Sequence, residues 1–212
     1  MQTLLRIDSS SRVEGSHSRE LGDYFEKRWK AAHPKGQVIH RDLVSSVLPH
    51  IHNDTIEGFY TAPEALDERK QKATKLSDHL ISELKSADEL LITSPLYNLN
   101  VPSNLKAYFD QVTRIGRTFM VQDGEYKGLL LDKVAYIVTA KGGSYQGTPM
   151  EAYDFQGPYL TAILHHVGIP VRKIFNLEGT ADQGTLVSNK IKLTQSIDSM
   201  FNHKNLAYED YE

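Results

Sequence analysis

The stretch LLITSPLYNLNVPSNLK, residues 90–106, constrains the fold of this chain more than any other. Residues 90–93 are apolar without polar alternation, which is typical of a strand buried on both faces of a parallel sheet. The strand is expected to end at Ser94 and Pro95, because a proline has no N–H for a ladder. Residues 96–100 form a loop with apolar and amide side chains, and a helix follows. Because open α/β sheets bind ligands at the carboxyl ends of their strands, we expect this loop at a binding site.

Strands and helices alternate along the rest of the chain. Further strands are predicted over residues 3–8, 37–43, 134–140 and 171–177, although Arg6 interrupts the first of them. Apolar residues at helical spacing predict helices from Ser18 to about Pro34, after Pro102, and over residues 63–86, 159–167 and 185–201. Residues 45–61 and the stretch after Lys141 as far as Pro158 are predicted to be irregular.

Residues 117–131 are predicted to form a β-hairpin, since Asp123-Gly124 is a strong signal for a two-residue turn. No break in composition divides the chain. Five strands with right-handed crossovers therefore predict one α/β domain over residues 1–212, a doubly wound parallel sheet in the order 2-1-3-4-5 with helices on both faces. The acidic tail, residues 207–212, is expected to fray or to dock late.

Composition excludes several classes of function. Hydrophobic residues make up 40% of the chain and charged residues 24%, so it can bury a core. A net charge of −3 gives no reason to expect nucleic acid or an anionic membrane as a partner. The absence of cysteine excludes disulfides, thiolate metal sites and cysteine nucleophiles. Arg6 and Asp8 interrupt the first apolar run, so no signal peptide is expected, and no run could span a bilayer. We expect a soluble cytoplasmic protein.

A serine-rich loop follows the first predicted strand. It places five serines within residues 9–18, ahead of a helix whose first N–H groups favour anions. Ser10, Ser16, His17 and Ser18 are the candidate ligands of a phosphate. The loop lacks the lysine of a Walker motif, so it suits a monophosphate better than a triphosphate. The alternative is a polar loop in which Ser18 is only the N-cap.

Two other loops follow the third and fourth strands of the predicted sheet. The one at residues 95–100 offers a flat apolar surface with backbone N–H groups, which suits a planar heteroaromatic ring; the alternative is a buried crossover with Leu96 and Leu99 in the core. Lys141-Gly142-Gly143 lets the backbone approach a ligand closely, and its amides could stabilise negative charge on a reduced ring; the alternative is a flexible turn. All three loops are expected on the same edge of the sheet.

Three motifs carry a resemblance to a known family: SSSRVEGSHSREL at residues 9–21, SPLYNLNVPSNLKAYFDQVTRIGRTF at 94–119, and AKGG at 140–143. The chain resembles, over essentially its whole length, the bacterial FMN-dependent NADH azoreductases, also described as NADH:quinone oxidoreductases, which have the flavodoxin-like fold. The resemblance implies that the first motif binds the FMN phosphate and that the other two contact its isoalloxazine ring. The residues implied for the ring are Pro95, Leu96, Tyr97, Asn98, Leu99, Ala140, Lys141, Gly142 and Gly143.

The resemblance also implies how such an enzyme works. NADH or NADPH would reduce the flavin, and a quinone or azo acceptor would then enter the same pocket, in a ping-pong mechanism. The flavin carries the chemistry, so no catalytic side chain is expected. Relatives of this kind are homodimers with the ring near the interface, and Phe119 and Tyr145 are candidates to line the pocket. Three departures from the family pattern stand out: His17 where glutamine is common, Leu96 where methionine is common, and Ala140-Lys141 where Ser-Arg is frequent. His17 can still donate a hydrogen bond to a phosphate, whereas the other two are expected to alter ring potential or acceptor choice.

Other readings of the sequence are weaker. Residues 142–146 nearly spell a hydrolase nucleophile elbow, but Gln146 stands where a glycine is needed. The pairs His50 with His52 and His165 with His166 lack an evident third ligand, so no metal is predicted. The main rival is a flavodoxin-like electron carrier or regulator that binds FMN without turning over small acceptors. The near-neutral charge, the hairpin and the long loop after Gly143 favour an enzyme.

Overall fold

The computed structural model describes residues 1–206, so the tail at residues 207–212 lies outside the described part of the chain. Its centre is a five-stranded parallel sheet in the order β2-β1-β3-β6-β7. The strands are β1 (Thr3–Asp8), β2 (Gln37–Asp42), β3 (Glu89–Pro95), β6 (Val134–Ala140) and β7 (Val171–Leu177). The predicted order 2-1-3-4-5 is confirmed, because a separate antiparallel hairpin, β4 (Phe119–Gln122) and β5 (Glu125–Gly128), intervenes before the fourth strand of the sheet.

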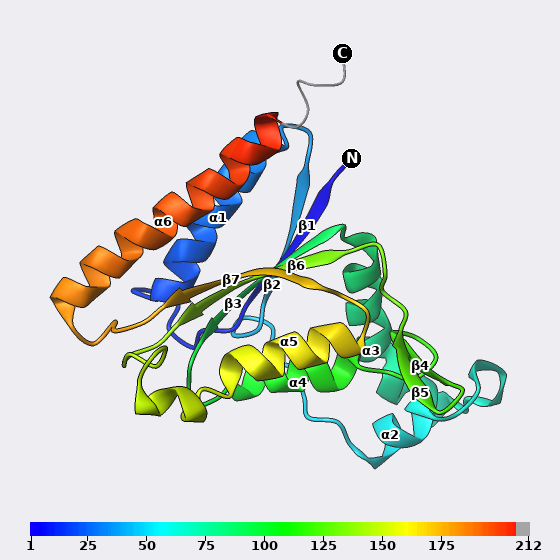
Figure 1. The fold of residues 1–212 in the computed structure, drawn as a ribbon. Helices are drawn as coiled ribbons and strands as arrows, with labels where there is room; N and C mark the ends of the chain where they lie inside the picture. Colours follow the sequence, from blue (N-terminus) through cyan, green and yellow to red (C-terminus); the bar gives the residue numbers. More distant parts are fainter. Residues whose placement is uncertain (207–212) are drawn as a thin grey trace.

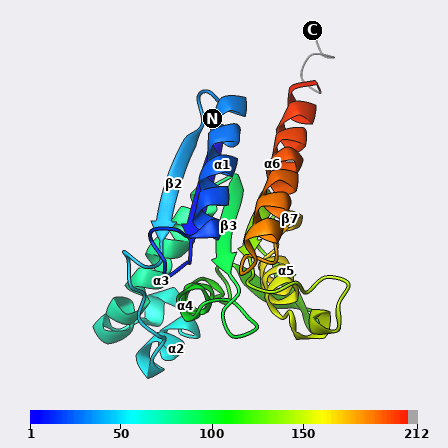
Figure 2. The same ribbon diagram turned by 90° about the vertical axis from the view of Figure 1, so that its left-hand side faces the viewer.

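Helices cover both faces of this sheet (Figure 1). On one face α1 (His17–Ala32) lies beside α6 (Gln183–Leu206), as Figure 2 also shows. On the other face lie α3 (Glu68–Ser86), α4 (Ser103–Val112) and α5 (Gln156–His166). None of the described helices is long and apolar enough to cross a membrane.

The central strands contain runs of consecutive apolar residues because each of them packs against helices on both faces. In β3, Leu90 and Ile92 join the core cluster under α3, α4 and α5, whereas Leu91 between them joins the cluster under α1 and α6. Successive side chains of a strand point to opposite faces, so a strand covered on both sides buries apolar residues at consecutive positions. The same alternation holds in β6, where Ile137 and Val138 face opposite clusters.

Arg6, which interrupts the apolar run of β1, is buried and faces α1. Its guanidinium pairs with Asp8 at 3.0 Å, with Asp23 at 2.7 Å and with Glu26 at 3.0 Å. A buried cation is tolerated only where partners replace its lost hydration. This network lies directly below the end of β1 and therefore supports the loop that follows.

Several predicted boundaries are wrong. Residues 45–61 contain a short helix, α2 (Asn53–Phe59), and the predicted helix over 63–86 is a 3-10 turn, η1 (Pro63–Ala65), followed by α3. Asp67 caps α3 by accepting from the Lys70 N–H at 2.8 Å. The strand β3 continues through Pro95, which pairs with Ala140 at the end of the ladder.

The prediction of a long irregular loop before residue 159 is also wrong. It contains a second 3-10 turn, η2 (Pro149–Tyr153), and α5 begins at Gln156. Pro158 lies in the first turn of α5, where a missing N–H removes no intrahelical bond. The last helix begins at Gln183, two residues before the predicted start, and Asp182 accepts from the Thr185 N–H at 2.8 Å there.

The predicted hairpin is present, with Asp123 and Gly124 both at positive φ (55° and 81°) in its turn. It is held against the end of α5 by an unusually close backbone contact. A Cβ placed on Gly128 would lie 2.1 Å from the Gly168 nitrogen, closer than any real Cβ contact. Only glycine therefore fits at position 128.

We expect Gly128→Ala to lower the free energy of unfolding by about 2–4 kcal/mol, because the backbone of either segment must move to admit the methyl group. Urea denaturation measures this loss. Gly157→Ala is the matched control: a Cβ at Gly157 meets nothing within 4 Å and the residue is helical, so a gain of up to about 1 kcal/mol is expected. Equal effects of the two substitutions would contradict the close contact.

Candidate functional site

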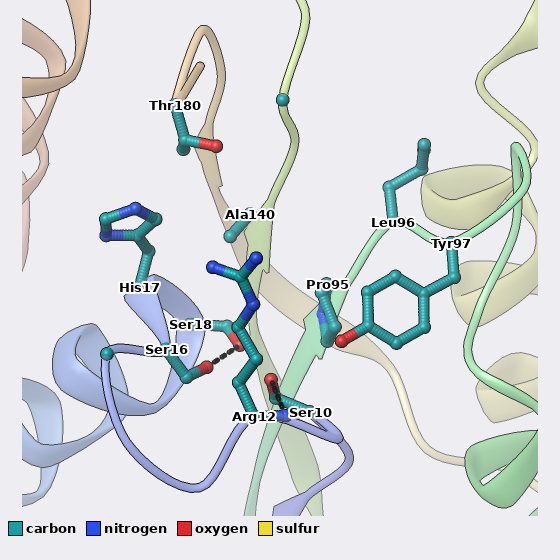
Figure 3. Close-up of a pocket in the computed structure, with 12 residues that line it drawn as sticks. Ser10, Arg12, Ser16, His17, Ser18, Pro95, Leu96, Tyr97, Ala140 and Thr180 are labelled. Carbon is teal, nitrogen blue, oxygen red and sulfur yellow. Dashed lines mark hydrogen bonds between the residues drawn. The ribbon is translucent and has the colours of Figure 1, made fainter. Parts of the chain in front are cut away.

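The three predicted loops meet at the carboxyl edge of the sheet and surround one cavity of about 210 Å³ (Figure 3). The loop after β1, the end of β3 with its following loop, and the end of β6 each contribute to the wall. A fourth segment, after β7, adds Thr180. The residues that line the cavity are Ser10, Arg12, Gly15, Ser16, His17, Ser18, Pro95, Leu96, Tyr97, Ala140, Gly142 and Thr180.

The serine loop is fixed at its start by the neighbouring strand. Both the N–H and the hydroxyl of Ser9 donate to the Thr93 carbonyl, at 3.1 and 2.9 Å. The Ser10 carbonyl accepts from the guanidinium of Arg19 at 2.9 Å, and Arg19 comes from the first turns of α1. The loop then turns at Gly15, which has a φ of +64°. The backbone between Ser9 and α1 is thus tied down at both ends.

At the other end of this loop Ser16, rather than Ser18, caps the helix. The Ser16 side chain accepts from the Arg19 N–H, and α1 begins one residue after it, at His17. Ser16 and Ser18 hydroxyls lie 3.3 Å apart, and with Ser10 they form a set of three buried hydroxyls on the cavity wall. The first turn of a 16-residue helix adds N–H groups and a partial positive charge at the same place.

Arg12 supplies a full positive charge to the same part of the cavity. Its side chain is exposed and extends into the cavity that His17 also lines (Figure 3). Arg12 belongs to the motif at residues 9–21, but it was not among the predicted phosphate ligands. The signal was present, because an arginine inside a loop that is rich in hydroxyls is a natural partner for a phosphate.

An ion pair below the loop links it to β2. The guanidinium of Arg19 donates to both carboxylate oxygens of Asp42, each at 2.8 Å. These hydrogen bonds from Arg19 hold the pKa of Asp42 below its ordinary value. A carboxylate with a lowered pKa stabilises the fold above the pKa of the unfolded chain, and this contribution is lost as the pH falls through the lower, folded-state value.

We therefore expect Asp42→Asn to lower the free energy of unfolding by about 1 kcal/mol at pH 7, since the bidentate pair is only partly exposed. The gap from the wild type should begin to shrink as the pH drops below about 4, where the unfolded chain takes up a proton at Asp42, and it should close below the lower pKa of the folded state. Urea unfolding at pH 7 and pH 3 compares the two proteins. A gap of the same size at both pH values would show that the carboxylate charge is not what stabilises the loop.

The loop after β3 presents its first residues to the cavity and turns away afterwards. Pro95, Leu96 and Tyr97 line the cavity, and the Leu96 N–H donates to the Ala140 carbonyl at 2.8 Å. Tyr97 and Asn100 exchange backbone hydrogen bonds at 2.9 and 3.0 Å across a tight turn. This turn carries Asn98 and Leu99 at φ values of 48° and 71°.

The predicted ring-contacting residues Asn98 and Leu99 do not line this cavity. Asn98 lines a neighbouring cavity of about 440 Å³ on the far side of Tyr97, and the Leu99 carbonyl accepts from the Phe155 N–H at 3.1 Å. Leu96 and Leu99 are half-buried and belong to neither core cluster, so this segment is not the buried crossover that was the alternative. A leucine at positive φ stores strain, which is common at functional sites.

The loop after β6 contributes backbone and almost no side chain. Ala140 and Gly142 line the cavity, and a Cβ placed on Gly142 would meet nothing within 4 Å. The loop is held against the segment after β7, because the Lys141 and Gly143 carbonyls accept from the N–H groups of Thr180 and Gly179 at 3.0 Å each. Open space in front of Gly142 leaves room for a ligand to reach the backbone.

Lys141 does not point into the cavity. Its side chain is 1% exposed, and its ammonium pairs with Asp154 and, at 3.3 Å, with Glu178. Glu178 also accepts from the Tyr145 N–H at 2.8 Å. The predicted ring contact of Lys141 can thus come only from its backbone, while its side chain fixes residues 141–154 to the segment after β7. Tyr145 is 9% exposed and packs near this cluster, outside the cavity wall.

Phe119 lies elsewhere, in the hairpin. Its ring contacts His166 and Tyr126, with centroid distances of 4.5 and 6.0 Å, and it does not line the cavity within the chain. The histidine pairs do not form a metal site either. His52 caps α2 instead of sharing a strand face with His50, and residues 1–202, whose side chains the structure describes, hold no cluster of three possible ligands.

Two members of the site gave no readable signal in the sequence. Thr180 reaches the cavity only because the segment after β7 hydrogen-bonds to the loop after β6. Gln156 is fully buried below the end of β3, and its amide contacts Ser94 and Pro95. Both positions depend on contacts between segments far apart in sequence.

Comparisons with known proteins agree with this architecture. A family model described as the flavodoxin-like fold matches residues 2–195. An FMN-dependent NADH:quinone oxidoreductase of Xanthobacter autotrophicus is 48% identical over 79% of this chain and 82% of its own length. One of the same name from Nostoc punctiforme is 39% identical over 93% of this chain and 98% of its own length. The crystal structure of an azoreductase from Bacillus anthracis, 25% identical, superimposes with a TM-score of 0.85 over 94% of this chain and 100% of that one. The chain therefore belongs to the family with the flavodoxin-like fold, among the FMN-dependent NADH:quinone oxidoreductases.

Proposed function

We propose that this chain is an FMN-dependent NAD(P)H oxidoreductase that reduces quinones by two electrons and cleaves aromatic azo bonds to amines. The observation that carries the proposal is the convergence of three loops on one cavity, one rich in hydroxyls and two with apolar or bare backbone surface. Two relatives, 48% and 39% identical, carry the name FMN-dependent NADH:quinone oxidoreductase, and a structural neighbour is an azoreductase.

The residues of the cavity fit the two ends of FMN. Ser10, Ser16 and Ser18, the first turn of α1, His17 and Arg12 would hold the phosphate, since they offer donors and positive charge. Pro95, Leu96 and Tyr97 on one side would hold the flavin ring by apolar and backbone contacts. The bare Gly142 backbone would face the ring on the other side, in the space that a Cβ would fill.

When bound, FMN supplies the two-electron carrier that accepts a hydride from NADH or NADPH and passes it to an acceptor. The protein's residues would bind and orient FMN and tune its reduction potential. Backbone amides at Lys141–Gly143 would favour negative charge at the ring edge beside them, and no side chain need act as a nucleophile. A single cavity would serve donor and acceptor in turn, which gives ping-pong kinetics. A quinone needs one such cycle and an azo bond needs two.

The proposal includes a homodimer located in the cytoplasm, with residues 1–212 as one FMN-binding domain. The apolar surface of the hairpin supports the homodimer, because Met120, Val121, Tyr126 and Leu131 are exposed beside Phe119. An exposed apolar patch of this kind is typical of an interface. In such a dimer Phe119 and Tyr145 would complete the pocket near the partner subunit.

The test is to purify the chain, identify any bound flavin after acid release, and follow NADH and NADPH oxidation with and without a quinone or an azo dye. The enzyme should bind FMN and oxidise the nicotinamide rapidly only when an acceptor is present. Double-reciprocal plots at several acceptor concentrations should be parallel, as ping-pong kinetics requires. Bound FMN without turnover would identify an electron carrier or regulator instead. Failure to bind FMN would reject the proposal.

A further inference from the structure

A fully buried glutamine sits below the point where β3 enters the cavity wall. Gln156, the first residue of α5, is 0% exposed. Its side-chain nitrogen donates to the Pro95 carbonyl at 2.7 Å, to the Ser94 hydroxyl at 3.0 Å and to the Ser94 carbonyl at 3.2 Å. One amide group thus contacts three oxygens at the end of a single strand.

These partners decide which way the amide faces. Two of them are carbonyl oxygens, which only accept, so the NH₂ group must point towards β3 and the oxygen away from it. In that orientation Gln156 Oε1 is buried without a hydrogen-bond partner among the residues that the structure describes. A buried unpaired oxygen is unfavourable, so the hydrogen bonds of the NH₂ group must offset the free energy that the unpaired oxygen costs.

Gln156 is itself held by the cluster around Lys141. The Gln156 N–H donates to the Asp154 carboxylate at 3.2 Å, and the other oxygen of this carboxylate accepts from Lys141. Lys141 in turn is anchored through its N–H to the Leu177 carbonyl at 2.8 Å. A continuous chain of contacts therefore runs from the loop after β6, through Asp154 and Gln156, to the end of β3.

This chain of contacts joins the two walls between which a flavin ring would lie. Its one end is at Pro95, beside Leu96, and its other end is at Lys141, beside Ala140 and Gly142. The two walls also meet directly, through the hydrogen bond from the Leu96 N–H to the Ala140 carbonyl at 2.8 Å. Protection of the Leu96 N–H from exchange therefore shows whether the end of β3 stays in place against β6.

We propose that Gln156 is a positioning residue, which fixes Pro95 and Leu96 against Ala140 and so sets the shape of the ring-binding wall. Its consequence for FMN rests on the proposed function, whereas its effect on the loop does not. Gln156 is fully buried and does not line the cavity. It acts through the backbone of the two residues that line the cavity.

Gln156→Met tests this, because methionine keeps the volume and removes the donor. Gln111→Met is the matched control. Gln111 is also a buried glutamine, at 2% exposure, with a single hydrogen bond from its nitrogen to the Pro49 carbonyl and an unpaired Oε1. It lies in α4, and its partner Pro49 does not line the cavity, whereas the Gln156 partner Pro95 does. If both variants lose a similar amount of thermal stability, any difference between them at the site cannot come from general destabilisation.

Two measurements are made on the full chain. Without FMN, amide hydrogen exchange at Leu96 should be about tenfold faster in Gln156→Met than in the wild type and unchanged in Gln111→Met, as expected for the loss of one hydrogen bond's stabilisation. With FMN, quenching of flavin fluorescence should give a Kd raised about tenfold in Gln156→Met only.

Each outcome decides the matter. Unchanged exchange at Leu96, or equal acceleration in both variants, overturns the positioning role. Faster exchange with an unaltered Kd for FMN overturns the claim that the position of this wall matters to the cofactor. A wild-type chain that does not bind FMN rejects the proposed function, and the exchange comparison alone then decides whether Gln156 holds the loop.

Discussion

The Ser16→Asp variant should bind FMN at least about 100-fold more weakly than the wild type while keeping α1 intact. Aspartate is as good an N-cap as serine, so it can accept from the Arg19 N–H as Ser16 does. It also places a negative charge where the phosphate is expected. Repulsion between unit charges about 4 Å apart near a protein surface is about 4 kcal/mol, which is more than enough for a loss of about 100-fold in affinity.

Ser16→Asn is the control, because asparagine caps a helix equally well and carries no charge. Its Kd for FMN should stay within about tenfold of the wild type. Riboflavin, which lacks the phosphate, supplies a second control: its affinity should be nearly the same for Ser16→Asp and Ser16→Asn. If Ser16→Asp weakens riboflavin and FMN equally, the substitution has distorted the cavity and Ser16 is not at the phosphate.

The strands of the sheet could be predicted because a strand that is buried on both faces has a run of consecutive apolar residues in the sequence. The bounds of β1, β6 and β7 agree with the prediction at every residue. Right-handed crossovers predict the strand order, and the strand order predicts which loops lie at the carboxyl edge. The meeting of the three loops at one edge could therefore be predicted. The strand β2 ends at Asp42, one residue before the predicted end, and as an edge strand it has only half-buried and exposed residues.

Helix boundaries were less predictable because they depend on a few capping contacts. The predicted loop ends at Pro158, yet a proline is equally suited to the first turn of α5. The short helix α2 has seven residues and is too short to be stable alone. It forms because it packs on α3, where Gly58 lies so close to Thr74 that a Cβ would be 2.5 Å from its methyl group. Such tertiary contacts leave no local pattern.

The cavity shows the same division. Ser10, Ser16, His17 and Ser18 all line it, since a loop that enters a helix N-terminus places its residues by local geometry. The direction of a long side chain is not local. Lys141 follows a strand and precedes two glycines, a pattern that predicts a ligand contact. Its ammonium is instead buried against Asp154 and Glu178, 13 and 37 residues further along the chain. Only the tertiary structure shows that this lysine has a supporting role.

Lys141→Met should therefore cost about 3–5 kcal/mol of unfolding free energy, among the largest losses expected of any single substitution in this chain. Removing the ammonium leaves two carboxylates, 16% and 12% exposed, without the cation that compensates their burial. The expected loss is measurable as a lower urea midpoint at pH 7. The loop that carries Gly142 should loosen as well, and FMN affinity should fall with it.

Two comparisons separate the buried charge from the loss of a lysine as such. Lys190→Met breaks an exposed pair with Glu20 and should change stability by no more than about 0.5 kcal/mol. The triple variant Lys141→Met, Asp154→Asn, Glu178→Gln removes the unpaired carboxylate charges. It should regain part of the lost free energy of unfolding, since burying a neutral amide costs less free energy than burying an unpaired carboxylate. If the triple variant is no more stable than Lys141→Met alone, the cluster does not stabilise the loop by charge compensation, and the packing of the lysine stem against its neighbours accounts for the whole effect.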